Sequence, residues 1–323
     1  MTILGLILAL LIIAYAWSWV WQSGRPHTGP AEAPAAPRVT GTTILLCHRM
    51  AKRQSRATLG AGWATARAGL VQGHADDIGY RTYAQVLQVS RWNVIYLLLR
   101  ISRSWPVAAK FSVLHGLPIP RLTLFNREAR REAKREDWDM IELLDFADDA
   151  AALRFVQSAA AAALAQDARA HTSRSQAVAM ITTRAFLRGA IAPDAAVTLF
   201  CLRARPVLGR DGMLDYWLDR HRPYVQGLEP ILGYAWYDQL IARGAEGLSA
   251  PAAALDNAPG APWDGVANIG YSHMRDVVRG LWDLRVQTTN MRLVYDETRF
   301  IDLSRSSLML GNVRTVVRAG PTL

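Results

Sequence analysis

The chain has 323 residues, a formal net charge of +10 and two cysteines. Two cysteines exclude a disulfide-stapled small domain and indicate reduced thiols; with no CxxC or histidine pair nearby, they also predict no metal site. The positive charge raises the question of nucleic-acid binding, and the answer depends on where along the chain the basic residues lie.

The first 22 residues predict a transmembrane anchor. Residues 2–21 carry no charged side chain, which is about the length that crosses a bilayer as one helix, and tryptophans gather at its far end. A cleaved signal peptide is the alternative, but the segment lacks the basic leading region of such peptides. Arg25 and Arg38 follow the segment and no basic residue precedes it, so we expect a single-pass inner-membrane protein with a cytoplasmic globular part. Residues 23–40, rich in Pro and Ala, predict a flexible linker.

The rest of the chain contains an internal duplication. Residues 45–87 align without a gap to the chain 154 positions later, and 12 of the 43 pairs are identical. A second block matches at a shift of 125, so the first copy carries 29 additional residues between the blocks. We therefore predict copy one over 41–190 and copy two over 191–323. The identical pairs of the first block are Leu45/Leu199, Cys47/Cys201, Arg49/Arg203, Arg56/Arg210, Trp63/Trp217, Val71/Val225, Gln72/Gln226, Gly73/Gly227, Gly79/Gly233, Tyr80/Tyr234, Tyr83/Tyr237 and Gln85/Gln239.

The insertion of copy one, about residues 88–136, carries most of the excess positive charge. It holds ten Lys or Arg against three Glu, interleaved with bulky apolar residues, in a chain that already has a predicted anchor. This pattern favours a surface that lies on anionic lipid over nucleic-acid binding. A buried element followed by a solvated basic helix is the alternative.

Each copy reads as the same sequence of elements. In copy two we predict a strand over 196–202, a helix around 213–228 with Asp211 as its N-cap, strands over 233–237 and 265–271, a helix over 274–287 and a strand over 307–317. Copy one fits the same order, with a first strand over 43–48, a second helix over 148–168 and a last strand near 177–186. The order β-α-β-β-α-β is that of the ferredoxin-like split unit. The fold class is therefore α+β, with two tandem ferredoxin-like units packed as an intramolecular dimeric α/β barrel, preceded by one transmembrane helix.

Two strings of copy two resemble EthD-domain proteins. Residues 215–223, Asp-Tyr-Trp-Leu-Asp-Arg-His-Arg-Pro, are similar to the YW…H.P helix of that family, and residues 296–306 are similar to its D-x-x-RF-x-D segment. Copy one is degenerate, since Arg67 stands where copy two has His221. The resemblance implies a dimeric α/β barrel whose relatives include cofactor-independent oxygenases, decarboxylases, polyketide cyclases and isomerases, many of which act on aromatic or hydrophobic molecules.

His221 is the first candidate catalytic residue, because it lies on the apolar stripe of its helix and an imidazole there suits general acid/base chemistry. A core histidine with a purely structural hydrogen bond is the alternative reading. Asp302 either orients His221 or caps the turn into the last strand, and His273 stands near a strand end. The candidate ligand-binding residues are Tyr216, Trp217, Tyr234 and Trp236 as aromatic walls, with Arg203 for a substrate carboxylate.

No phosphate loop, dinucleotide fingerprint or metal-ligand pattern stands in the sequence, so no cofactor is expected. The leading prediction is a membrane-anchored, EthD-like, cofactor-independent enzyme that acts on a hydrophobic or aromatic small molecule. The alternative is a non-catalytic ligand-binding or assembly module that docks on a membrane protein or forms a homo-oligomer.

Overall fold

A computed structural model describes residues 41–50, 62–89, 138–172, 178–243, 263–302 and 305–318. The predicted anchor, the linker and residues 90–136 of the insertion lie outside these ranges. Within them, no helix is both long enough and apolar enough to cross a membrane.

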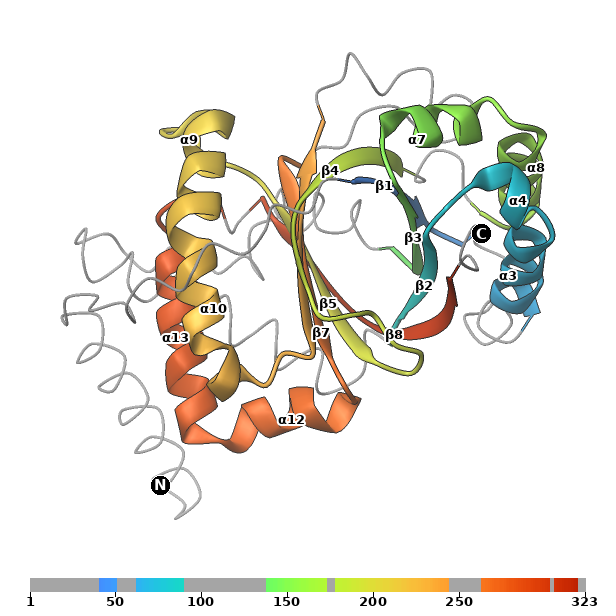
Figure 1. Cartoon of the computed structure of the whole chain (residues 1–323). Helices are drawn as coiled ribbons and strands as arrows, with labels where there is room; N and C mark the ends of the chain where they lie inside the picture. Colours follow the sequence, from blue (N-terminus) through green and yellow to red (C-terminus); the bar gives the residue numbers. More distant parts are fainter. Residues whose placement is uncertain are drawn as a thin grey trace.

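Eight strands close into an antiparallel barrel in the order β1-β3-β2-β8-β5-β7-β6-β4 (Figure 1). Copy one supplies four neighbouring strands in the order β4-β1-β3-β2, and copy two repeats this order as β8-β5-β7-β6. The two copies meet at the pairs β2–β8 and β4–β6. The strands are β1 Thr42–His48, β2 Thr82–Gln88, β3 Met140–Phe146, β4 Val178–Arg188, β5 Ala196–Leu202, β6 Trp236–Ala242, β7 Gly265–Tyr271 and β8 Ser307–Arg318.

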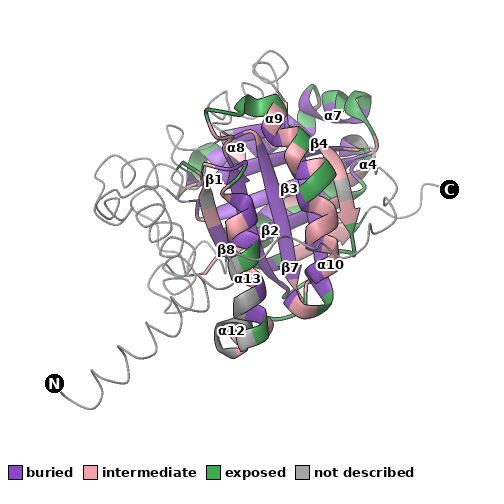
Figure 2. Ribbon diagram, turned by 90° about the vertical axis from the view of Figure 1, so that its left-hand side faces the viewer, coloured by how far each residue is buried: buried purple, intermediate pink, exposed green. Residues whose placement is uncertain are grey.

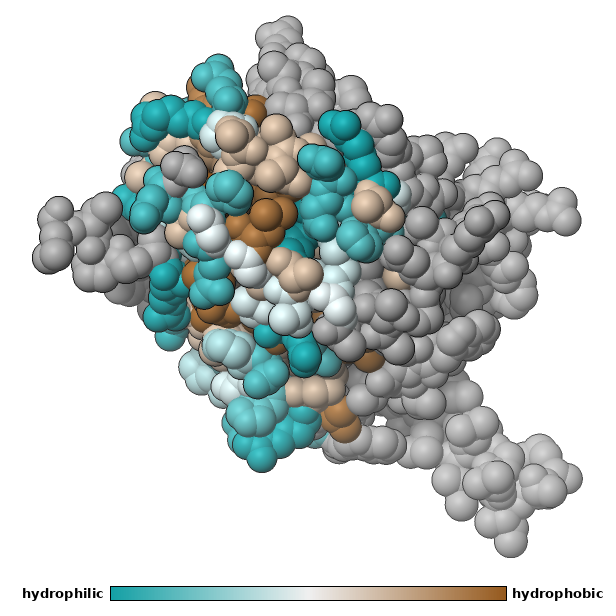
Figure 3. All heavy atoms as spheres, turned by 90° about the vertical axis from the view of Figure 1, so that its right-hand side faces the viewer, coloured by the Kyte–Doolittle hydropathy of each residue, from teal (hydrophilic) through white to brown (hydrophobic). Residues whose placement is uncertain are grey.

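The helices form two groups on opposite sides of the barrel (Figure 1). Copy one contributes α3 Ala64–Gly73, α4 Ala75–Ile78, α7 Asp149–Val156 and α8 Ala159–His171. Copy two contributes α9 Gly209–Tyr216, the π-helix η3 Trp217–His221, α10 Arg222–Leu232, α12 Met274–Trp282 and α13 Leu284–Glu297. On the face that carries the copy-one helices, hydrophilic side chains predominate, with apolar ones between them (Figure 3).

Most residues of the strands are buried, as the ribbon coloured by burial shows (Figure 2). Along β1, Leu45 and Cys47 pack in a cluster that contains residues of both copies, whereas Ile44 and Leu46 pack in a cluster of copy one alone. Because successive side chains of a strand point to opposite faces, the shared cluster fills the barrel and the other clusters lie beneath the helices. Cys47 and Cys201 are both buried, and neither forms a disulfide.

Several predicted boundaries need correction. The second strand of copy two begins at Trp236 rather than at Gly233, because Gly233 adopts a left-handed conformation (φ 71°) that ends α10. Asp211 is not an N-cap but lies in the first turn of α9. The second helix of each copy is interrupted, at Ser158 and at Asp283, since each of these side chains accepts hydrogen bonds from the first turn of a new helix.

An ion cluster crosses one of the two seams between the copies. Arg184 on β4 donates from Nη2 to Asp145 at 2.7 Å and from Nε to Asp238 on β6 at 2.9 Å. One guanidinium thus serves two carboxylates, and Asp238 is only 2% exposed. Burial raises the pKa of Asp238 to about 6, in spite of its contact with Arg184.

We expect this seam to lose stability as the pH rises. A folded-state pKa above the unfolded value means that the contribution of Asp238 is complete below about pH 4 and is lost as the pH rises through about 6. Relative to Asp238→Asn, the wild-type free energy of unfolding should fall by about 2–3 kcal/mol between pH 4 and pH 7. Urea unfolding of the wild type and of Asp238→Asn between pH 4 and pH 7 measures this difference. Parallel pH profiles of the free energy of unfolding in the two proteins would contradict the prediction.

Candidate functional site

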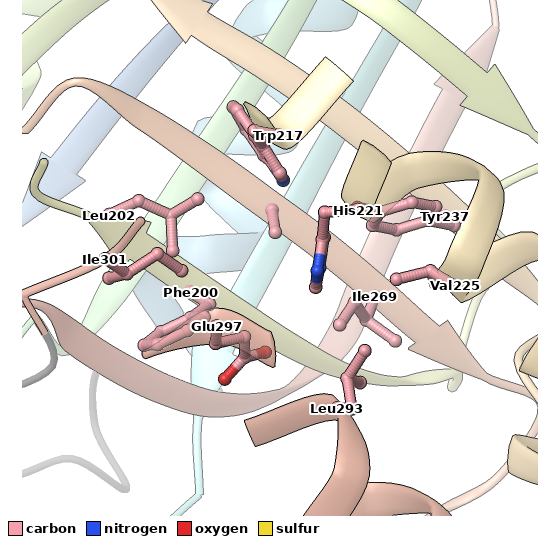
Figure 4. Close-up of a pocket in the computed structure, with 11 residues that line it drawn as sticks. Phe200, Leu202, Trp217, His221, Val225, Tyr237, Ile269, Leu293, Glu297 and Ile301 are labelled. Atoms are coloured by element: carbon pink, nitrogen blue, oxygen red, sulfur yellow. The ribbon is translucent and has the colours of Figure 1, made fainter. Parts of the chain in front are cut away.

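Copy two contains a cavity between the outer face of its sheet and its helices (Figure 4). Its walls come from β5, β6 and β7 on the sheet side and from η3, α10 and α13 on the helix side. The free space holds about one water molecule, so a larger ligand requires side-chain movement. The lining residues are Phe200, Leu202, Trp217, His221, Val225, Tyr237, Ala267, Ile269, Leu293, Glu297 and Ile301.

His221 is held in the cavity wall by a carboxylate. Its Nδ1 lies 2.8 Å from Oδ2 of Asp296 on α13, and both side chains are about 5% exposed. An ionised carboxylate accepts hydrogen bonds only, so this contact places the imidazole proton on Nδ1 and leaves Nε2 as the acceptor for a bound molecule. Burial disfavours ionisation of Asp296, but the hydrogen bond and charge of His221 outweigh it and lower the pKa of this carboxyl.

A second layer fixes Asp296 in turn. The hydroxyl of Tyr216 donates to Oδ1 of Asp296 at 2.7 Å, and Arg299 lies 3.6 Å from the same oxygen. The Phe300 ring stacks on Tyr216 with 5.1 Å between centroids and lies 4.9 Å from His221. Tyr216 and His221 belong to the first EthD-like string, and the other three residues belong to the second. The fold thus brings the two strings together.

The helix that carries His221 is widened at this residue. Trp217–His221 forms a π-helical turn in which the N–H of Arg222 donates to the carbonyl of Trp217. Pro223 follows and has no N–H to continue the α-helical ladder, which accounts for the local widening. This turn directs both Trp217 and His221 to the cavity side, where they are 1% and 4% exposed.

Glu297 and Tyr237 complete the polar part of the cavity. Glu297 is 3% exposed, and Figure 4 shows it beside Phe200 among the residues that line the cavity. The hydroxyl of Tyr237 accepts a hydrogen bond from Gln239 at 2.9 Å and another from Trp217. Apart from these two and His221, the lining residues are hydrophobic, so a ligand meets a few polar groups within an apolar wall, the usual composition of small-molecule sites.

Of the sequence-predicted site residues, His221 and Trp217 line the cavity, and Tyr216 lies behind it on Asp296. The others lie elsewhere among the described residues. Trp236 packs inside the barrel, on the other face of the sheet, and Tyr234 packs edge-on against Tyr271. His273 is exposed, and its main-chain N–H donates to Asp276.

Arg203 and Asp302 form a turn contact outside the lining. The main-chain N–H of Asp302 donates to the carbonyl of Arg203, and the N–H of Arg203 donates to Ser306. The carboxylate on His221 is therefore Asp296 and not Asp302. Sequence reasoning missed Asp296 and Glu297 as site residues, although both open the quoted D-x-x-RF string, because a string does not show which of its members faces the helix carrying His221.

The equivalent position in copy one is filled by charged side chains. Trp63, Arg67 and Tyr83 correspond to Trp217, His221 and Tyr237 at the shift of 154, and Glu142 corresponds to Ala267 at the shift of 125. Met50 and Ala204 are equivalent at the shift of 154, and each forms an isolated β-bridge, to Thr172 and to Ile301 respectively. These two partners are therefore equivalent, which aligns the last helices of the two copies at a shift of 129. At that shift Asp167 corresponds to Asp296, and Ala168 to Glu297.

Arg67 binds Glu142 inside copy one. Its Nε lies 2.8 Å and 2.9 Å from the two carboxylate oxygens, and both side chains are at most 1% exposed. Nη1 of Arg67 also donates to Asp167 at 2.9 Å. This contact is the equivalent of the contact between His221 and Asp296 in copy two. Nε2 of His48 lies 2.6 Å from Glu142, and the hydroxyl of Tyr83 donates to the same carboxylate. Copy one thus holds an ion pair where copy two has its cavity.

No known family model and no curated protein matches this chain. Solved structures do match over most of its length: an anthrone oxidase-like protein (9% identity, 90% of this chain and 97% of that one, TM-score 0.49), a presumed monooxygenase from Lactobacillus acidophilus (6%, 87% and 97%, 0.48) and chlorite dismutase from Candidatus Nitrospira defluvii (10%, 87% and 93%, 0.41). All three TM-scores lie below 0.5, so these similarities assign no activity to this chain. Among the described residues, no group of three His, Cys, Asp or Glu side chains is placed to hold a metal ion.

Proposed function

We propose that this chain is an EthD-like enzyme that carries out cofactor-independent acid/base chemistry on a small hydrophobic or aromatic molecule in the copy-two cavity. One observation carries the proposal: a buried imidazole in an apolar wall, with a carboxylate 2.8 Å from Nδ1.

The chemistry follows from the charge states. Nε2 of neutral His221 accepts a proton from an O–H or activated C–H bond of the substrate, and the imidazolium that forms is stabilised by Asp296. When Nε2–H returns the proton to another atom of the substrate anion, the result is an isomerisation or a cyclisation. Before the proton is returned, the same electron-rich anion can instead react with O2 in an oxygenation. In a decarboxylation the substrate loses CO2, and Nε2–H protonates the carbanion that remains. The apolar walls exclude water and strengthen these electrostatic interactions.

Two finer proposals concern the architecture. The shared strand order of the two copies supports tandem ferredoxin-like units that arose by duplication and pack as an internal dimer. We also propose that residues 1–22 anchor the chain in the inner membrane and that the insertion, about 88–136, rests on anionic lipid. The support for both of these proposals comes from the sequence of the two segments alone. Liposome flotation of the chain with and without residues 1–22 tests them.

A second candidate is a non-catalytic binding or assembly module. The small free volume of the cavity and the filled position in copy one favour it, because a module needs neither space nor a base. For such a module, the measurement of interest is whether the chain forms a homo-oligomer or binds a membrane-protein partner.

Native mass spectrometry of the full-length protein, extracted gently in detergent, separates the two. For an enzyme we expect a stoichiometric hydrophobic or aromatic compound to be released from the wild type and to be lost from Trp217→Ala, since Trp217 forms part of the wall. Trp236→Phe, on the other face of the sheet, is the control and should retain the compound. An empty protein that arrives with another membrane subunit would support the module.

A further inference from the structure

The charge of the cavity selects among ligands. Of the eleven described residues that line it, one is a glutamate and none is a lysine or arginine. Behind the wall, Asp296 adds a second carboxylate on His221, and Arg299 on its far side is 43% exposed. A buried site with this composition disfavours a further negative charge, because an anion there would lose its hydration and meet carboxylates.

The nearest described cations do not reverse this balance. Burial raises the pKa of Tyr237 most strongly, and hydrogen bonds from Gln239 and Trp217 lower it. After these, the charge of Glu297 raises this pKa, and the charge of Arg222, which lies outside the lining, lowers it. His221 adds a positive charge only when it is protonated, and Asp296 then neutralises it.

Copy one shows what a carboxylate at this place binds. There the carboxylate comes from the sheet as Glu142, and the chain itself supplies a planar cation, Arg67, whose guanidinium lies over the Trp63 ring. Copy two has Ala267 in place of Glu142 and supplies its carboxylate from the helix as Glu297. With His221 in place of Arg67, none of the described residues that line the cavity is an arginine.

We infer that the copy-two cavity is selective for neutral or cationic aromatic molecules that present an N–H or O–H donor to Glu297, and that it rejects carboxylates and phosphates. This inference rests on the proposed function and narrows its substrate class to phenols, enols, amides and amines, which removes the decarboxylation of a carboxylate from the possible reactions. Glu297 contacts the donor, while Nε2 of His221 takes or returns the proton. It also excludes the role predicted for Arg203, which lies outside the lining.

Three probes of one shape test the inference: benzamidine, benzamide and benzoate, which are positive, neutral and negative at pH 7.5. Isothermal titration calorimetry on the full chain in detergent should give binding of benzamidine and benzamide, with benzoate at least roughly tenfold weaker than either. In Glu297→Gln benzamidine should lose affinity relative to benzamide, and benzoate should gain affinity. Glu229→Gln, a buried glutamate of α10 that does not line the cavity, should keep the wild-type order.

The outcomes separate this inference from the function on which it rests. Benzoate that binds the wild type as tightly as benzamide overturns the charge selectivity and leaves an acid/base site in place. An unchanged order in Glu297→Gln, with unchanged melting temperature, removes Glu297 from the ligand contact and overturns the inference as well. If none of the three probes binds the wild type, both the cavity as a ligand site and its selectivity fail.

Discussion

Replacing Arg67 by alanine should lower the free energy of unfolding by about 3–5 kcal/mol, because it leaves a buried carboxylate without its cation. Arg67 is 1% exposed and donates to Glu142, to Asp167 and, at 2.7 Å, to the carbonyl of Leu164. The substitution also opens a cavity where a large side chain is now packed. Chemical denaturation monitored by tryptophan fluorescence measures the loss, and Arg154→Ala, an exposed residue of α7, is the control, with a change within about 0.5 kcal/mol.

The pairing can be isolated with a double substitution. If the cost arises from an uncompensated charge, Arg67→Ala with Glu142→Ala should be less destabilising than the sum of the two single variants. Strict additivity would instead mean that packing volume alone explains the loss. A loss below about 1 kcal/mol in the single variant would show that the network contributes little to copy one.

The same network predicts sensitivity to acid. Burial opposes ionisation of Glu142, but Arg67 and His48 outweigh it and hold the pKa of this carboxyl well below its usual range. A lowered folded-state pKa means that the contribution to stability is complete above the unfolded pKa, about 4.3, and is lost as the pH falls below it. Wild-type stability should therefore decline below about pH 4, and the decline should be shallower in the double variant.

The second large effect concerns catalysis at His221. His221→Asn should reduce turnover by about 10²–10⁴-fold, because the asparagine amide can still donate to Asp296 from the place of Nδ1 but offers no base at the place of Nε2. The melting temperature should change little, since the buried carboxylate keeps its hydrogen bond. The measurement is turnover of the compound released in native mass spectrometry or, if its product is unknown, the incorporation of solvent deuterium into that compound.

Asp296→Asn complements this experiment. An amide at position 296 can donate to Nδ1 and so stabilise the tautomer with its proton on Nε2, which cannot accept a proton from a substrate. Turnover should fall in this variant too, although the imidazole is present. Tyr234→Phe, an aromatic residue of copy two outside the cavity, is the matched control. Full turnover in His221→Asn would remove His221 as the base. A compound that the wild type binds but does not convert would leave the binding module as the better account.

Local patterns in the sequence were sufficient for much of the fold. The strands 43–48, 196–202, 265–271 and 307–317 lie within a residue of their observed bounds, because a short apolar run with β-branched residues has few other ways to be buried. The order of elements in copy two followed from the same patterns. The breaks at Ser158 and Asp283 were missed because helical periodicity continues across a cap whose side chain merely restarts the hydrogen bonds.

Only the tertiary structure decided the site. The sequence gives His221 an apolar helix face, and periodicity cannot say which carboxylate 75 residues later meets it; the packing of α13 on η3 and α10 selects Asp296 rather than Asp302. Trp236 and Tyr237 are neighbours in the chain, yet one lies in the barrel and the other in the cavity wall, since a strand alternates its faces and the register sets which face is which. The duplication itself was predicted from the sequence alone. That one copy holds an ion pair and the other a cavity depends on residues that several separate strands and helices bring together, and no local sequence pattern predicts this.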